Sequence, residues 1–365
     1  MSTRRQLVTF PDRSVDFRIG AGALEEFSRL VSGVVVRPQR ALVVSALDLG
    51  DERLIAVERG LIDTGFTVAQ HELDADRPFA VEDTGPLFDR LAAKGFTADD
   101  LIVAIGSEQV CALVSWCAHA WCGGMAAVFV PTTLAAMACA TTRDAGLAVG
   151  GVAGMASLPP APEMTVCDLA PVMAESDPEQ LRPGYVELVR ASLADSVRAW
   201  ERLRDETDVL LSGDEIFLIT VLGDAQSTGA QVASAPNPSS RYAFDFGVTS
   251  ARALRACLGA EVPWHQLVAE GMRFEARLAV EVEDLDTDIA FELDDVLEAL
   301  GVDELAFTLD ATAFVEALKR ERFRRANRLM FALPRYAGTI RLSTVEDEVL
   351  MRHARAYLAA KAELV

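Results

Sequence analysis

Two short stretches of the sequence carry residue types that bind metal ions in other proteins. Cys117, His119 and Cys122 lie close together and offer sulfur and imidazole ligands. They fall on a predicted buried helix, where packed small side chains are the commoner use of such residues. The acidic stretch 281–295 is interleaved with Leu, Ile and Phe and lacks the spacing and central glycine of a calcium-binding loop. We therefore interpret the first stretch as core and the second as a solvated helix-and-loop face.

A second kind of chemistry, the binding of an anion, is possible at Arg252. This arginine lies in a predicted helix, where its guanidinium either forms a salt bridge within the helical region or binds an anion in a cleft. We favour the anion, because guanidinium is the usual bidentate partner of phosphate and carboxylate.

The first half of the chain alternates between short apolar runs and helical patterns. Because strand and helix in alternation predict parallel strands joined by crossover helices, we expect a doubly wound α/β sheet. Ligands bind such sheets at the carboxyl ends of the strands. The expected strands are 41–46, 67–73, 101–106 and 125–130, and the expected helices are 51–65, 81–95 and the stretch from 107 to 122.

The second half is mainly helical. The turn-rich stretch 233–240 is a predicted loop. We expect an α/β domain over residues 1–168 and a helical domain over residues 169–365. The expected helices are 182–211, 250–258, 263–280, 293–300 and 311–325.

Composition excludes several classes of protein. The chain has 365 residues, enough for roughly two domains at about 150 residues each. Its 55 acidic and 34 basic residues give a net charge of −21, which disfavours nucleic acid and anionic membranes as partners but not an anionic small substrate. The six cysteines lack the spacing of a disulfide framework, and we expect free thiols. Residues 1–9 show no secretory signal, and 110–134 reads as a buried helix and strand rather than a membrane span, so we expect a cytoplasmic protein.

Five segments, in this order and spacing, resemble the 3-dehydroquinate synthases and the wider sugar phosphate cyclase family. That family's segments run V-P-T-T-L-L, G-x-A-E-[VI]-[IL]-K, N-[FY]-G-H-T-x-G-H, H-G-E-A-V-A-x-G-M and a basic run before an L-P strand. The matching segments here are V-P-T-T-L at 130–134, R-P-G-Y-V-E-L-V-R at 182–190, F-D-F-G at 244–247, W-H with E-G-M at 264–272, and F-A-L-P at 331–334.

The resemblance implies a nucleotide-binding α/β domain, a helical domain, an active site in the cleft between them, and a homodimer. The family uses NAD and a divalent metal, usually zinc, to eliminate phosphate from a sugar phosphate and close a carbocycle. One glutamate and two histidines hold the metal. By resemblance Glu187 is the glutamate and His265 the second histidine, while Val248 stands where the first histidine should be. A catalytic zinc site needs three protein ligands, so the implied site is one ligand short unless Asp245 substitutes.

Other positions follow the family in part. Gly106, Thr132 and Thr133 match cofactor-binding positions, but Ser107 and Glu108 stand where the family has glycines that approach the diphosphate. Side chains there obstruct a close approach of backbone, and Glu108 adds negative charge. The remaining substrate-side positions are arginines: Arg190 for a lysine, Arg252 for a histidine, Arg241 beside the third segment, and Arg322 for a C-terminal lysine.

Each matched residue also has an ordinary structural interpretation. Glu187 either lies in the site or on an exposed helix turn, and His265 either lies in the site or packs under Trp264. Thr132 and Thr133 either bind cofactor or end a strand.

We do not expect authentic 3-dehydroquinate synthase activity, since each lost base or metal ligand costs about 2–5 kcal/mol of transition-state stabilisation. The first hypothesis is a diverged lyase or cyclase of specialised (natural-product) metabolism that acts on an anionic small metabolite. It would use Glu187, His265 and the four arginines in acid–base chemistry. The alternatives are a catalytically silent paralogue that binds a small ligand or a partner protein, and an NAD- and zinc-dependent cyclase with substitute ligands.

Overall fold

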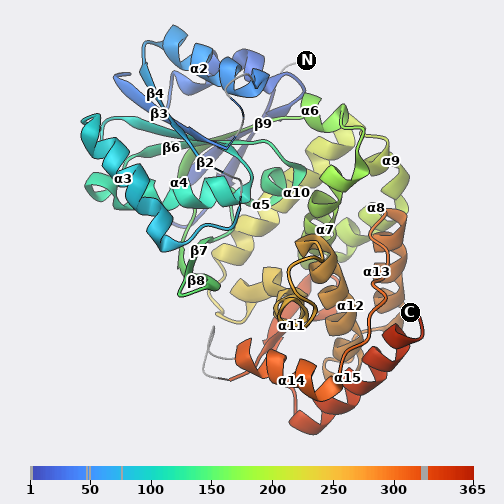
Figure 1. The fold of residues 1–365 in the computed structure, drawn as a ribbon. Coiled ribbons are helices and arrows are strands. Elements are labelled where there is room, and N and C mark those ends of the chain that lie inside the picture. Colours follow the sequence, from blue (N-terminus) through green and yellow to red (C-terminus); the bar gives the residue numbers. More distant parts are fainter. Residues whose placement is uncertain (1–2, 47, 49–50, 75–76, 322–327) are drawn as a thin grey trace. The chain divides into compact units, whose positions relative to one another are not determined.

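The computed structural model describes residues 3–46, 48, 51–74, 77–321 and 328–365. The chain forms two compact units, each described here by itself (Figure 1). The first comprises 1–176 and 213–230, and the second 177–212 and 231–365. A single boundary at residue 168 was expected. The division in the structure instead crosses the chain three times, and the later segment 213–230 belongs to the first unit.

A seven-stranded sheet with the order β1-β2-β9-β6-β5-β3-β4 forms the centre of the first unit. Only β1 runs antiparallel to its neighbour, and the pairs from β2 to β4 are parallel. The strands are β1 (Arg4–Thr9), β2 (Ser14–Gly20), β3 (Arg40–Ser45), β4 (Thr67–Glu72), β5 (Leu101–Gly106), β6 (Ala126–Pro131) and β9 (Pro162–Asp168). The four strands expected from the sequence are confirmed, and they lie side by side.

Alternating side chains of the sheet enter two separate cores. In β5, Ile102 and Ala104 face one core, whereas Val103 and Ile105 face the other. Helices α3 (Thr84–Ala93) and α4 (Glu108–Ala120) cover the first core, and α1 (Phe27–Val31) and α2 (Glu52–Thr64) cover the second (Figure 1). Helices on both faces make this a doubly wound α/β sheet, as predicted.

The rest of the first unit consists of smaller elements and one long helix. A hairpin of β7 (Ala145–Val149) and β8 (Val152–Leu158) stands apart from the main sheet. The long helix is α10 (Glu215–Ala233), which the sequence analysis did not predict. The smaller elements are η1 (Ala23–Glu26), η2 (Val81–Asp83), η3 (Trp121–Gly123), α5 (Leu134–Cys139) and α6 (Ala170–Met173).

The second unit is mainly helical, as expected. The single helix expected over 182–211 is three helices, because Ser196 leaves helical geometry and caps the second with its side chain. The acidic stretch 281–295 is a helix end, a loop and a new helix that begins after the capping residue Asp286. The helices are α7 (Pro178–Asp195), α8 (Val197–Asp205), α9 (Thr207–Leu211), η4 (Ser240–Asp245), α11 (Val248–Leu258), α12 (Trp264–Val282), α13 (Thr287–Ala299), α14 (Ala311–Arg320) and α15 (Asp347–Ala362), with a hairpin of β10 (Phe331–Tyr336) and β11 (Thr339–Ser343).

The structure bears on two expectations from the sequence, which concern membrane-spanning helices and the state of the cysteines. No helix of the described residues is long and apolar enough to cross a membrane. All six cysteines are free thiols, and Cys111 and Cys117 are buried on α4 as core side chains. Burial raises the pKa of the Cys117 thiol to about 12, so this sulfur stays protonated at neutral pH.

Candidate functional site

The carboxyl ends of β5 and β6 bring together the residues that resemble a cofactor site. The backbone N–H of Thr132 donates to the carbonyl of Gly106 at 2.9 Å. Thr133 caps α5, since its hydroxyl accepts from the N–H of Ala136 at 3.1 Å. Gly106 is required by packing, because a Cβ there would stand 2.8 Å from a methyl group of Val110. These three residues therefore lie at the sheet edge where doubly wound folds bind ligands.

The turn from β5 into α4 does not fit a dinucleotide diphosphate. Ser107 caps α4, and its hydroxyl accepts from the N–H of Gln109 at 3.1 Å. Glu108 places a carboxylate in the first turn, where it stabilises the positive end of the helix dipole. A bound diphosphate would compete with this hydroxyl for backbone donors and would meet the charge of Glu108.

Glu187 and Arg190 form the charged pair of the second unit. They lie one turn apart on α7, and a guanidinium nitrogen of Arg190 forms an ion pair with Glu187 Oε1. The second nitrogen, Nη1, donates to the carbonyl of Phe244 at 2.7 Å. The Arg190 side chain is 2% exposed and that of Glu187 15%. Glu187 is thus not on an exposed helix turn, and Arg190 ties α7 to the end of η4.

The segment after η4 holds no histidine and is capped from within. Gly247 adopts a φ of 82° at the start of α11, and Val248 follows as a buried apolar residue. The buried carboxylate of Glu275 on α12 accepts from Gly247 N at 2.7 Å and from Ser250 N at 3.0 Å. This carboxylate accepts hydrogen bonds from the backbone N–H groups at the N-terminus of α11. In the resembled family, the first metal-ligating histidine stands at this end of the helix.

The remaining arginines and Asp245 occupy different surroundings. Arg241 is exposed, and its Nε donates to the carbonyl of Ala235 at 2.6 Å. Arg252 is half-buried on α11, one turn after Val248, and Asp245 is half-buried at the end of η4. Arg322 lies outside the described residues.

His265 lies in the first turn of α12. Burial lowers the pKa of His265 below its usual 6.5; nearby Glu179 opposes this shift and Arg182 adds to it. Its Nε2 is buried without a hydrogen-bond partner among the described residues. The charged groups acting on His265 are therefore those near the start of α7, two turns before Glu187.

Because α12 is continuous, the position that corresponds to the family's second histidine changes from 265 to 264. The family's segment places its histidine seven residues before the glycine of G-M, whereas His265 is six residues before Gly271. Because α12 runs unbroken from Trp264, the helix offers no place for an extra residue. A shift of one residue turns a side chain by about 100° around a helix. Trp264, whose side chain is 43% exposed, stands at the position of the histidine.

The residues present do not fit a divalent metal. A catalytic zinc site uses three protein ligands. Within the described part of the chain, no group of three or more His, Cys, Asp or Glu side chains is placed to hold a metal ion. Of the three expected positions, Glu187 is paired with a guanidinium, Val248 is apolar, and Trp264 replaces the histidine.

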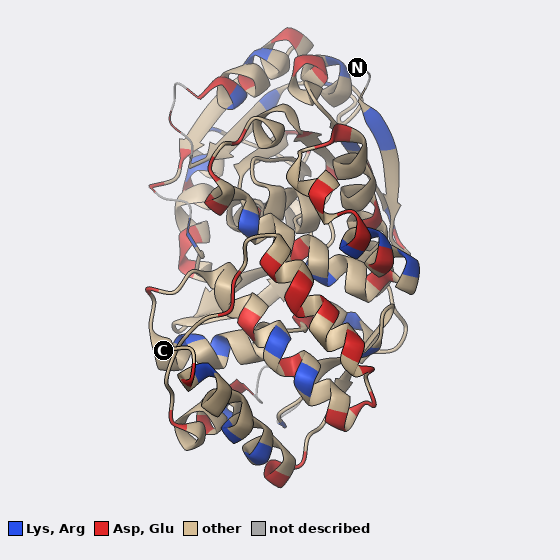
Figure 2. Cartoon of the chain, turned by 90° about the vertical axis from the view of Figure 1, so that its right-hand side faces the viewer, with Lys and Arg blue, Asp and Glu red and all other residues tan. Residues whose placement is uncertain are grey.

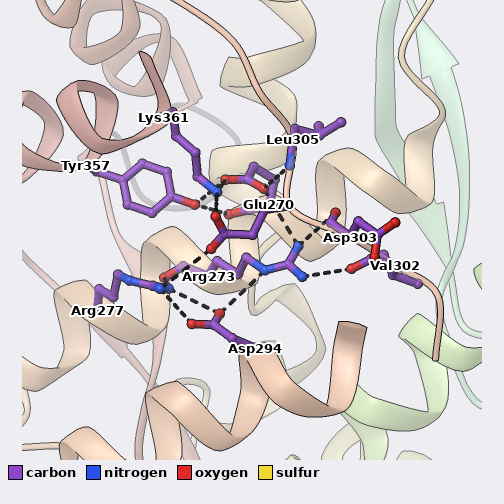
Figure 3. A network of polar contacts seen from close by, with 10 residues as sticks. Glu270, Arg273, Arg277, Asp294, Val302, Asp303, Leu305, Tyr357 and Lys361 are labelled. Carbon is purple, nitrogen blue, oxygen red and sulfur yellow. Dashed lines mark hydrogen bonds and ion pairs between the residues drawn. The ribbon is translucent and has the colours of Figure 1, made fainter. Parts of the chain in front are cut away.

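Sequence reasoning missed a buried network around Glu270 (Figure 3). Glu270 is fully buried on α12 and lies 2.6 Å from Nζ of Lys361 and 3.7 Å from Arg273. The hydroxyl of Tyr357 also donates to it. The only local signal was the spacing of Glu270 and Arg273 by one helical turn. Since its groups are mutually paired, the network is a structural tie between α12 and α15.

Comparisons with known proteins agree with this architecture. No protein-family model matches the chain. The sequence is 22% identical over 359 residues to the 3-dehydroquinate synthase of Rippkaea orientalis, covering 94% of this chain and 96% of the relative. It is 24% identical over 363 residues to that of Microcystis aeruginosa, with the same coverage of 94% and 96%.

A solved sugar phosphate cyclase shares the fold over almost the whole length. A 2-deoxy-scyllo-inosose synthase, complexed with carbaglucose-6-phosphate, NAD+ and Co2+, aligns with a TM-score of 0.82 and 18% identity, covering 97% of this chain and 100% of that one. The chain is thus similar over nearly its whole length to 3-dehydroquinate synthases, and it shares the fold of a sugar phosphate cyclase.

Proposed function

We propose that the chain is a diverged sugar phosphate cyclase-family enzyme that acts on an anionic small metabolite by acid–base chemistry of the carbon–oxygen lyase type. The observation that carries the proposal is the half-buried Glu187 carboxylate, kept at the family's glutamate position beside Arg190. A solved relative in fold binds carbaglucose-6-phosphate, which supports a phosphorylated, sugar-like ligand. The altered metal positions argue against authentic 3-dehydroquinate synthase activity, and the departures favour specialised metabolism.

The residues define what such an enzyme must find in its substrate. Glu187 takes a proton from carbon, the C–H electron pair forms a double bond, and the neighbouring C–O bond breaks to release phosphate with its electron pair. A carbonyl beside the C–H makes that proton acidic enough for a carboxylate base. Because the turn at Ser107 and Glu108 does not fit NAD, this chain requires a substrate that already carries the carbonyl. Arg252 and Arg241 are the proposed partners of the phosphate.

Binding of inorganic phosphate and glucose 6-phosphate, measured by calorimetry, tests the proposal. We expect Arg252→Met to weaken binding at least about tenfold, the effect of losing roughly 1.4 kcal/mol from one charged hydrogen bond. Arg255→Met is the matched control, since Arg255 lies on the same helix and donates to the carbonyl of Gly259 at 3.0 Å. Equal losses in both variants, or no binding of either probe, would reject the anion site.

A second candidate is a catalytically silent paralogue. The specific observation in its favour is that Glu187 already has a cation beside it and Arg190 is almost fully buried. Release of phosphate from a ketone that carries the phosphate on its β-carbon, such as 4-hydroxybutan-2-one phosphate, followed by ³¹P NMR, separates the two. Binding without phosphate release, unchanged in Glu187→Gln, supports the silent paralogue. Micromolar binding of NAD would instead support the NAD-dependent alternative and overturn our interpretation of Ser107 and Glu108.

A further inference from the structure

We infer that the guanidinium of Arg190 takes the place of the divalent cation at Glu187, so that this site carries a covalently attached positive charge and binds neither Zn²⁺ nor Co²⁺. The inference concerns the residues of the proposed function but does not require the chain to be an enzyme. It is tested below without substrate, so the two can fail independently.

The geometry of Arg190 leaves no room for a metal ion on the paired oxygen. A zinc ion bound by a carboxylate stands about 2.0–2.2 Å from the oxygen. The guanidinium already contacts Glu187 Oε1 and is held there by a second bond, from Nη1 to the Phe244 carbonyl at 2.7 Å. A divalent ion at this place would also be repelled by the positive charge of the guanidinium, in surroundings that solvent screens poorly. A metal ion would therefore have to displace a buried, doubly held side chain.

An arginine can hold this position in a way that a lysine cannot. Its planar fork directs separate N–H groups at two acceptors, here a carboxylate on α7 and a backbone carbonyl at η4. Lysine would offer a single point charge. The change from the family's lysine to Arg190 thus converts a substrate-side position into a bridge between two elements.

The other ligand positions changed in the same direction. Val248 is 9% exposed and offers no lone pair, and Trp264 stands at the position of the second histidine. The buried carboxylate of Glu275 accepts hydrogen bonds at the N-terminus of α11. The residues at 248 and 264 thus each remove a metal ligand, and Glu275 satisfies the backbone donors of Gly247 and Ser250.

A second pair on the same helix is a natural comparison. Glu179 and Arg182 have the same spacing of one turn, but their side chains are 55% and 22% exposed, against 15% and 2% for Glu187 and Arg190. The spacing of one helical turn therefore does not by itself distinguish Glu187 and Arg190 from the pair near the start of α7. Burial distinguishes the two pairs, because solvent screens the charges of Glu179 and Arg182 but screens those of Glu187 and Arg190 poorly.

Metal content is the first measurement. The full chain is purified without chelator, analysed by plasma mass spectrometry, and then titrated with Co²⁺ while its visible absorption is recorded. We expect metal well below one ion per chain and no absorption band of a protein-bound cobalt. Stoichiometric zinc that is lost in Glu187→Gln, or a cobalt band that requires Glu187, would overturn the inference.

A double-mutant cycle on the unfolding temperature is the second measurement. Glu187→Gln strips a buried cation of its partner and should lower the unfolding temperature by about 10 °C. Glu187→Gln combined with Arg190→Met should restore most of this loss, because both charges then leave together. The matched cycle, Glu179→Gln with Arg182→Met, should show almost no coupling. Additive effects at 187 and 190, equal to those at 179 and 182, would show that Arg190 does not act as the cation of Glu187.

Discussion

The network around Glu270 makes a direct prediction about the C-terminal helix. Lys361→Met removes the ammonium group that lies 2.6 Å from Glu270 and 3.2 Å from Glu304, and it keeps the length and apolar stem of the side chain. Lys361 is 3% exposed and Glu270 is fully buried, so water cannot replace the lost partner. The change isolates the charge because packing is nearly conserved.

The expected magnitude follows from the partners that remain. Breaking a buried ion pair by removing one group costs about 3–5 kcal/mol. Glu270 keeps the guanidinium of Arg273 at 3.7 Å, the N–H of Leu305 at 3.2 Å and the hydroxyl of Tyr357. We therefore expect the lower end, about 3 kcal/mol, which corresponds to a fall of about 10 °C in the unfolding temperature for a unit of this size.

Urea unfolding followed by circular dichroism measures the loss, with Arg352→Met as the control. Arg352 also lies on α15, but its pair with Glu281 is exposed, at 63% and 41%, and should contribute less than about 1 kcal/mol. Tyr357→Phe should fall between the two, since it removes one hydrogen bond to a charged acceptor, worth about 1.5–3 kcal/mol. If Lys361→Met were as stable as Arg352→Met, the network would not be what holds α15, and the reasoning from burial would be refuted.

Three further predictions concern pH, backbone and capping. Burial lowers the pKa of His265 in the folded protein, so stability is full above the usual 6.5 and falls as the solution becomes more acidic. His265→Asn should reduce the loss measured by urea unfolding between about pH 7.5 and about pH 5, and an unchanged loss would contradict this assignment. Gly247→Ala should cost about 3 kcal/mol or more, because its φ of 82° is strained for alanine and the new Cβ would stand 2.7 Å from the carbonyl of Val268. Gly259→Ala, at a φ of 87° with open space around it, should cost only about 1 kcal/mol, and equal losses would mean that the close packing at Gly247 is unimportant. Asp168→Ala leaves three backbone N–H groups without their acceptor and should cost about 3 kcal/mol in thermal unfolding, whereas a loss below about 1 kcal/mol would show that water replaces the carboxylate.

Strands β3, β5 and β6 were predictable because they are short, apolar on both faces and separated by helical patterns, whereas β1, β2 and β9 were not predicted. Helix α10 was not predicted either, because most of its sides are buried and it therefore lacks the amphipathic stripe on which such predictions depend. It contains small residues where other groups come close: a Cβ on Gly223 would stand 2.8 Å from the side chain of Gln6. Such proximity between residues far apart in sequence leaves no local pattern to read.

The residues of the candidate site could be identified from the sequence, but most of their contact partners could not. Glu187 and Arg190 were identified from their segment, and their spacing shows that they can meet on one helix face. The bond from Arg190 to the Phe244 carbonyl joins residues 54 apart and could not be read from the sequence. The same holds for the contact between Glu270 and Lys361, which lie on different helices. His265 was assigned to the site by resemblance, and the unbroken helix from Trp264 argues for the neighbouring position.

Four arginines stand at or beside family positions in a chain whose net charge is −21. Their partners bear on what each of them can bind. The described helices carry acidic and basic residues side by side (Figure 2), and Arg190 is paired with a carboxylate on its own helix. A guanidinium that is already bonded to a carboxylate and a carbonyl has little left to offer an anion, because both interactions must be broken before a phosphate can replace them. The anion site that we propose therefore rests on Arg252 and Arg241, and we expect the replacement of Arg190 to alter stability more than affinity for phosphate.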